Sequence, residues 1–149
     1  MNRYLVFDTS IIIPYLVHGG HAALFKTALR RGMALLPAPV LHELYTGTRS
    51  KSDKNDVDRI YGSFKQIDGI LTPSEEDWAV SGIYMARYIR SFGKVEPKDH
   101  LTDLLIAILA SNVGAPLVTQ NRKDMVRWQK ILKGSGKNLI LYPVERSLS

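Results

Sequence analysis

Residues 4–16, YLVFDTSIIIPYL, place one acid, Asp8, directly after four strand-like apolar residues and before two hydroxyl residues. An acid in this position has two interpretations. It caps a helix that follows the strand, which is a structural role, or it belongs to a set of acids that the fold brings together from distant parts of the chain. The rest of the sequence helps to distinguish them.

Short apolar runs alternate with amphipathic segments along the chain. Strands are predicted at 4–7, 33–37, 116–119 and 138–142, with a weak one at 67–71. Helices are predicted at 20–31, 39–47, 56–66, from 73–76 through 90, at 100–114 and at 123–132, with 48–59 as a loop and helix start. This alternation predicts one α/β domain over residues 1–149, with a central parallel sheet of four to five strands flanked by helices on both faces. Ligands bind such sheets beyond the carboxyl ends of the strands, where Asp8 is expected.

The composition narrows the class of protein. The absence of cysteine excludes a thiol nucleophile and a Cys-ligated zinc site, and it suits the cytosol. No apolar run approaches the roughly 20 residues of a membrane helix, and Asp8 interrupts any signal-peptide core. We therefore expect a soluble, cytoplasmic protein with no membrane partner. The 20 Lys and Arg residues against 14 Asp and Glu give a net charge of +6, which favours a polyanionic partner.

Further polar residues occur where an apolar pattern does not require them. Glu43 lies on a short, mostly apolar helix after the second strand, and Asp103 lies in an apolar helix with Asp99 one turn before it on the same face. The turn after the fourth strand carries Thr119, Asn121 and Asp124. Taken singly, each has an ordinary role as a surface, helix-dipole or turn residue. Taken together, they are predicted to meet Asp8 at one edge of the sheet.

This arrangement resembles the PIN-domain nucleases, in particular the VapC-type toxins of bacterial and archaeal toxin–antitoxin pairs. The matching stretches follow in order over almost the whole chain: FDTSIIIPYL, PAPVLHELYTG, TDLLIAILASNVGAPLVTQNRKDM and NLILYP. By position, the resemblance implies that Asp8, Glu43 and Asp103 are the three core acids of the family. The fourth position falls on either Asn121 or Asp124, and the sequence leaves that choice open.

Such a set of acids requires a cation, because two carboxylates at ~4 Å repel by about 4 kcal/mol at an effective dielectric near 20. Mg²⁺ and Mn²⁺ prefer oxygen ligands and relieve this repulsion. The resemblance implies a Mg²⁺- or Mn²⁺-dependent endoribonuclease, in which Asp8 and Asp103 bind the metal directly and Glu43 binds it through water or holds the nucleophile. The residues expected to support them are Ser10, Thr119 and Asp99. Because water attacks, the predicted products carry 5′-phosphate and 3′-hydroxyl ends.

Two groups of basic residues are candidates for contact with RNA. One group is spaced along one face of the last predicted helix and its end: Lys123, Arg127, Lys130 and Lys133. The other comprises Arg30, Arg31, Arg49, Lys51 and Lys54, of which we select Arg49 and Lys51. A solvated basic surface is the alternative interpretation, and a steep loss of RNA affinity with salt would argue against it. The resemblance also implies a small VapB-like antitoxin as partner and a homodimer.

Other classes of function fit less well. A metal-free ribonuclease would use a histidine pair, but His18 and His21 flank two glycines with no orienting acid nearby. A phosphatase of the haloacid-dehalogenase type would need a second Asp where this chain has Ser10, and the glycine-rich loops of nucleotide-binding proteins are absent. The remaining alternative is a catalytically inactive PIN-fold RNA-binding module, which Asp8→Asn or Asp103→Asn would distinguish from an enzyme.

Overall fold

The computed structural model describes residues 3–144, which form five strands and seven helices. The strands are β1 (Leu5–Phe7), β2 (Ala34–Pro37), β3 (Ile70–Leu71), β4 (Leu117–Val118) and β5 (Leu141–Tyr142). The helices are α1 (Thr9–His18), α2 (Ala22–Arg30), α3 (Ala38–Thr46), α4 (Lys51–Gln66), α5 (Glu75–Phe92), α6 (Pro97–Val113) and α7 (Arg122–Lys133). Within this part of the chain, no helix combines the length and the apolar character needed to cross a membrane.

The five strands are parallel and lie in the order β3-β2-β1-β4-β5. Central β1 pairs with β2, Leu5 opposite Ala34, and with β4, Phe7 opposite Val118. The chain runs outward from β1 through β2 to β3 and then returns to the other side of β1 for β4 and β5. The direction of travel reverses between β1 and β4, and ligands bind open α/β sheets at such a point. The predicted α/β fold with a central parallel sheet is confirmed.

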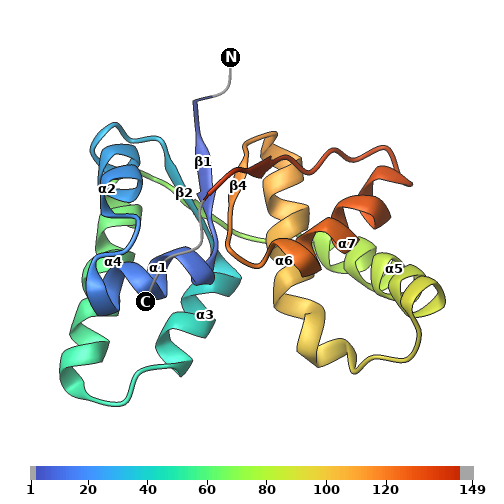
Figure 1. Cartoon of the computed structure of the whole chain (residues 1–149), viewed down its shortest axis with the longest axis horizontal. Coiled ribbons are helices and arrows are strands. Elements are labelled where there is room, and N and C mark those ends of the chain that lie inside the picture. The colour runs from blue at the N-terminus through green and yellow to red at the C-terminus, as the bar shows by residue number, and fades with distance from the viewer. Residues whose placement is uncertain (1–2, 145–149) are drawn as a thin grey trace.

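Helices cover both faces of this sheet (Figure 1). Helices α1, α2 and α4 lie on one side of the central strands, whereas α5, α6 and α7 contact one another on the other side. Helix α3 begins directly after β2 and contacts α1, α4 and α6, so it links the two layers beyond the carboxyl ends of the strands. The prediction of helices on both faces is also confirmed.

The hydrophobic core fills both layers. Phe7 of β1 meets Phe25 of α2 edge to face, with ring centroids 5.1 Å apart, and in the other layer Tyr88 of α5 stacks on Trp128 of α7 at 4.4 Å. Residues 104–110 of α6 are all buried. Because this helix is enclosed along its middle, a polar side chain immediately before that stretch is held in a partly desolvated position.

Helix α4 begins five residues earlier than the sequence predicted. Ser50 Oγ accepts a hydrogen bond from the backbone N–H of Asp53 at 3.0 Å, which caps the helix at its start. The first turns carry exposed polar residues, and the buried positions of α4 begin only at Val57. The helix start therefore falls inside the predicted loop and helix start at 48–59, but at Lys51 rather than at 56, because hydrophobic periodicity does not detect a solvent-exposed helix start.

Candidate active site

Asp8 lies where the strand order reverses, and it is both a helix cap and a buried acid. Its side chain is 3% exposed. Its Oδ1 accepts from the N–H of Thr9, which caps α1, while Oδ2 accepts from Ser10 Oγ at 2.9 Å and from Thr119 Oγ1 at 2.6 Å. Burial raises the pKa of Asp8 above its usual value, although the hydrogen bonds from Thr119 and Ser10 oppose the shift. The capping interpretation of this acid is therefore correct, and its role in a set of functional acids stays a prediction.

Glu43 reaches the same region from α3. Its Oε1 accepts a hydrogen bond from Thr9 Oγ1 at 2.6 Å, across 34 residues of sequence. Burial raises the pKa of Glu43, and the negative charge of Asp8 raises it further, while the Thr9 hydrogen bond and the charge of His42 act in the opposite direction. Glu43 is thus oriented by the residue that follows Asp8, and the two acids repel each other.

Asp103 completes the group from α6. Its Oδ2 accepts a hydrogen bond from Asn121 Nδ2 at 3.1 Å. Burial raises the pKa of Asp103 to about 7, and the charges of three other acids contribute, in the order Asp8, Glu43 and Asp124. Asp103 is therefore about half protonated near neutral pH in the absence of a cation. The electrostatic coupling links Asp103 to three of the other acids that the sequence singled out, and Asp99 is not among them.

The turn after β4 connects these residues through its backbone. The N–H of Asn121 donates to Thr119 Oγ1 at 2.9 Å, and the N–H of Gln120 donates to Ser10 Oγ at 2.9 Å. Ser10 and Thr119 hydroxyls thus accept from this turn and donate to Asp8. At the open fourth position, Asn121 touches Asp103 directly, whereas Asp124 acts on it through charge.

The fit of a metal ion rests on the chemistry of these donors. Among residues 3–144, no three side chains of His, Asp or Glu lie close enough together to hold one ion. The site nevertheless offers carboxylate and amide oxygens, and the ion pairs found in the described residues, Lys54–Asp58 and Arg59–Asp56, belong to α4 and neutralise none of the site acids. Mg²⁺ keeps several waters and is commonly held by one or two carboxylates. The donor set fits such a hydrated ion, and binding by all three acids stays a prediction.

The predicted RNA-binding residues lie in different settings. Lys123 and Lys130 are exposed on α7. Arg127 instead donates to the hydroxyl of Tyr88 at 3.2 Å and lies over the ring of Phe92, 5.0 Å from its centroid. The Arg127 side chain is therefore engaged in packing α7 against α5. Its role in RNA contact stays a prediction.

The second basic group and one predicted supporting acid lie at the surface. Arg49 is exposed between α3 and α4, and Lys51 is exposed as the first residue of α4; the backbone N–H of Arg49 donates to the Asp53 carboxylate in the first turn of α4. Asp99 is exposed in the first turn of α6, one turn before Asp103. The roles proposed for these residues stay predictions.

Sequence analysis did not select Thr9 or Gln120. Thr9 orients Glu43, and the side-chain amide of Gln120 lies 2.6 Å from His21 Nε2. A hydroxyl directly after Asp8 was visible in the sequence, but the same pattern is common at helix starts. No local signal identifies Gln120, because its partners lie 99 and 110 residues away.

Comparison with known proteins places this geometry in a known fold. No protein-family model matches the sequence, and no curated protein matches it. Among solved structures, a chain of DNA-bound VapBC from Salmonella typhimurium matches with a TM-score of 0.67 and 18% identity, over 93% of this chain and 96% of that one. A chain of VapBC2 from Rickettsia felis, bound to a promoter DNA fragment, matches with a TM-score of 0.69 and 20% identity, over 95% of this chain and 99% of that one.

A third match is VapBC-1 from nontypeable Haemophilus influenzae, with a TM-score of 0.63 and 17% identity, over 93% of this chain and 96% of that one. At these identities the likeness establishes the fold. The chain shares its fold with chains of VapBC and FitAB complexes. The resemblance found in the sequence is therefore confirmed at the level of the fold.

Proposed function

We propose that residues 1–149 form one PIN-like nuclease domain that cleaves RNA with the help of Mg²⁺ or Mn²⁺. The observation that carries this proposal is the mutual electrostatic repulsion of Asp8, Glu43 and Asp103 at the carboxyl ends of β1 and β4. The charge of Asp8 raises the pKa of Glu43, and the charges of Asp8, Glu43 and Asp124 raise the pKa of Asp103. With no neutralising ion pair in the described chain, this repulsion is destabilising unless a cation binds. Such an arrangement is typical of a functional site.

The contacts suggest a role for each acid in hydrolysis. Asp8, fixed by Thr9, Ser10 and Thr119, and Asp103, fixed by Asn121, would hold the ion. When bound, a divalent ion lowers the pKa of water and stabilises charge on a phosphodiester.

Glu43 would accept the proton of the attacking water. Thr9 donates to Oε1 of this carboxylate and orients it, and burial raises the pKa of Glu43, which makes it a stronger proton acceptor than a solvated glutamate. Attack of water on phosphorus with loss of the 3′-oxygen yields one 5′-phosphate and one 3′-hydroxyl end. A cyclic phosphate product would contradict this mechanism.

The biological setting that we propose is a toxin–antitoxin pair. Support comes from the likeness in fold to chains of VapBC and FitAB complexes, over 93–95% of this chain. The chain would act as the toxin in the cytoplasm, form a homodimer and pair with a small VapB-like antitoxin. Expression of the chain alone should slow growth, and Asp8→Asn should relieve the effect. Wild-type expression without any effect on growth would argue against a toxin.

The test of the enzymatic activity is cleavage of a cellular RNA pool in Mg²⁺ or Mn²⁺, followed by mapping of the cut ends. Wild type is compared with Asp8→Asn and with the matched variant Asp68→Asn. Asp68 is exposed and has a φ of 54°, a conformation that Asn tolerates well. We expect Asp8→Asn to abolish cleavage and Asp68→Asn to preserve it. Unchanged cleavage in Asp8→Asn would refute the assignment.

One observation favours a second candidate function. Because no three acids within residues 3–144 surround a common point, the fold is also compatible with an RNA-binding module that does not cut. In that case wild type and Asp8→Asn would bind RNA equally and neither would cleave it in either metal. The same experiment therefore distinguishes the two functions.

A further inference from the structure

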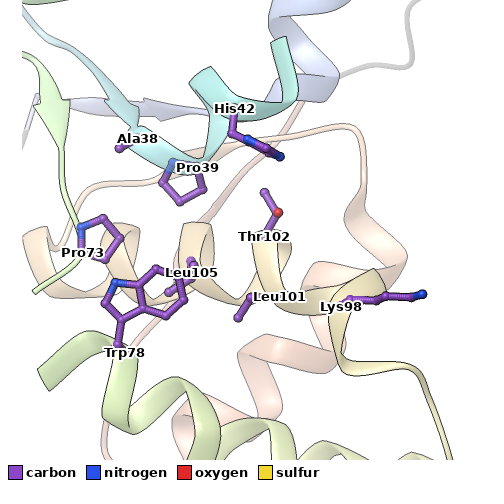
Figure 2. A pocket seen from close by; sticks show the side chains of 9 residues that line it. All are labelled: Ala38, Pro39, His42, Pro73, Trp78, Lys98, Leu101, Thr102 and Leu105. Atoms are coloured by element: carbon purple, nitrogen blue, oxygen red, sulfur yellow. The ribbon is translucent and has the colours of Figure 1, made fainter. Parts of the chain in front are cut away.

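A cleft of about 410 Å³ lies between α3, α5 and α6, next to the acids. Figure 2 shows its lining: prolines from the starts of α3 and α5, leucines of α6, and the indole of Trp78 directed from α5 towards them. Its polar members are His42, Lys98 and Thr102, and no acid lines it. The volume falls in the range of about 300–1,000 Å³ that is typical of small-ligand sites.

The cleft and the acids share two helices. His42 precedes Glu43 in α3, and Thr102 precedes Asp103 in α6. Neighbouring residues of a helix project about 100° apart, so these two contacting helices present acids to one side and the cleft to the other. The cleft and the acids therefore lie on adjoining faces of the same two helices.

Trp78 is the residue that gives the cleft a ligand preference. Its side chain is 51% exposed, whereas the other tryptophan, Trp128, is fully buried in the core. An exposed indole offers a flat surface on which a nucleobase stacks, and every base has a face that fits it. Lys98 adds positive charge at the same cleft. A basic protein segment finds no acid there to pair with, whereas a nucleotide finds both an aromatic surface and a cation.

We propose that this cleft binds one unpaired base of the RNA, adjacent to the phosphate that is cut. This inference rests on the nuclease function proposed above and adds a base-binding cleft outside the acids. Trp78 stacks on the base, His42 and Thr102 offer hydrogen bonds to its edge, and Lys98 contacts a flanking phosphate. A base held in a duplex is already stacked on its neighbours and does not enter the cleft.

Binding of a short unpaired RNA oligonucleotide tests the proposal, measured on the full chain carrying Asp8→Asn in Mg²⁺ so that the RNA stays intact. Adding Trp78→Ala should weaken binding by about 5- to 150-fold. It should also abolish the quenching of tryptophan fluorescence by RNA. The slope of log Kd against log salt should not change, because stacking releases no counterions, whereas Lys98→Ala should reduce that slope by about 0.7.

Ile83→Ala is the matched control, because Ile83 lies on the same helix, is 52% exposed and does not line the cleft. It should leave affinity unchanged, and Trp78→Phe, which keeps a ring, should lose less affinity than Trp78→Ala. The Ile83 and Trp78 substitutions replace exposed side chains, and circular dichroism checks that each variant keeps its fold.

The outcomes separate this proposal from the proposed nuclease function. If wild type cleaves RNA and Trp78→Ala binds and cleaves equally well, the base-binding cleft is refuted and the nuclease function stands. If sedimentation shows that Trp78→Ala converts a dimer into a monomer, the occupant is a second copy of the chain, and the proposal is overturned. If wild type fails to cleave any RNA while Trp78→Ala still weakens RNA binding, the nuclease function fails and the base-binding cleft stands.

Discussion

Asp103→Asn is expected to stabilise the metal-free protein at neutral and alkaline pH. Burial and the charges of three neighbouring acids raise the pKa of Asp103 from 3.8 to about 7. Between about pH 4 and pH 7, the folded protein therefore holds a proton that the unfolded chain has released, and stability falls as pH rises through this window. A difference of about three pKa units corresponds to about 4 kcal/mol. An amide in place of the carboxylate removes this penalty.

Of this penalty, about 2.5 kcal/mol develops between pH 5 and pH 8. The assay is urea unfolding in EDTA at both pH values, for wild type, Asp103→Asn and the control Asp68→Asn. The gain in free energy of unfolding caused by Asp103→Asn should be larger at pH 8 than at pH 5 by about that amount. Asp68→Asn should follow wild type, because Asp68 is exposed.

The same gain at both pH values would refute the reasoning, because it would show that the Asp103 carboxylate does not change its proton affinity on folding. A gain that disappears in the Asp8→Asn background would instead trace the shift to the charge of Asp8. Burial is the larger cause, so we expect the gain to shrink in that background without disappearing.

Three further predictions concern other contacts of the site. Thr119→Val leaves Asp8 without its 2.6 Å donor, so urea unfolding should show a loss of about 1–3 kcal/mol that Thr119→Ser restores. Mg²⁺ at pH 8 should raise the melting temperature of wild type, and Asp8→Asn should reduce this rise; an equal rise would place the ion elsewhere. Arg127→Ala should lower the melting temperature, because its guanidinium packs on α5, and both Arg127→Ala and Lys130→Ala should weaken RNA binding in a salt-dependent way.

Much of the fold was predictable because each element carries its own pattern. The central strand at 4–7 and the helix ending at Gly114 follow from apolar runs and a glycine that adopts a φ of 68°. The start of α4 was not predictable from periodicity, since its capping residue Ser50 begins a fully solvated turn. Parallel pairing followed from the alternation of strands and helices, but the strand order did not.

The candidate site was only partly predictable. Asp8, Glu43 and Asp103 stood out because acids occur there in apolar surroundings, and the structure couples their charges. The same reasoning grouped Arg127 with Lys130 as candidates for RNA contact and gave no sign that Arg127 packs on aromatic rings of α5. Helical spacing shows which residues share a face, but it does not show which neighbour covers that face.

The sequence by itself determined the elements and the acids at their ends, because hydrophobic periodicity and capping act over a few residues. Tertiary structure alone decided which groups meet. Thr119 reaches Asp8 across 111 residues, and Thr9 reaches Glu43 across 34, because β4 returns to lie beside β1 and α3 crosses the carboxyl ends of the strands. The cleft around Trp78 arises in the same way, from three helices whose contacts depend on the order of strands in the sheet.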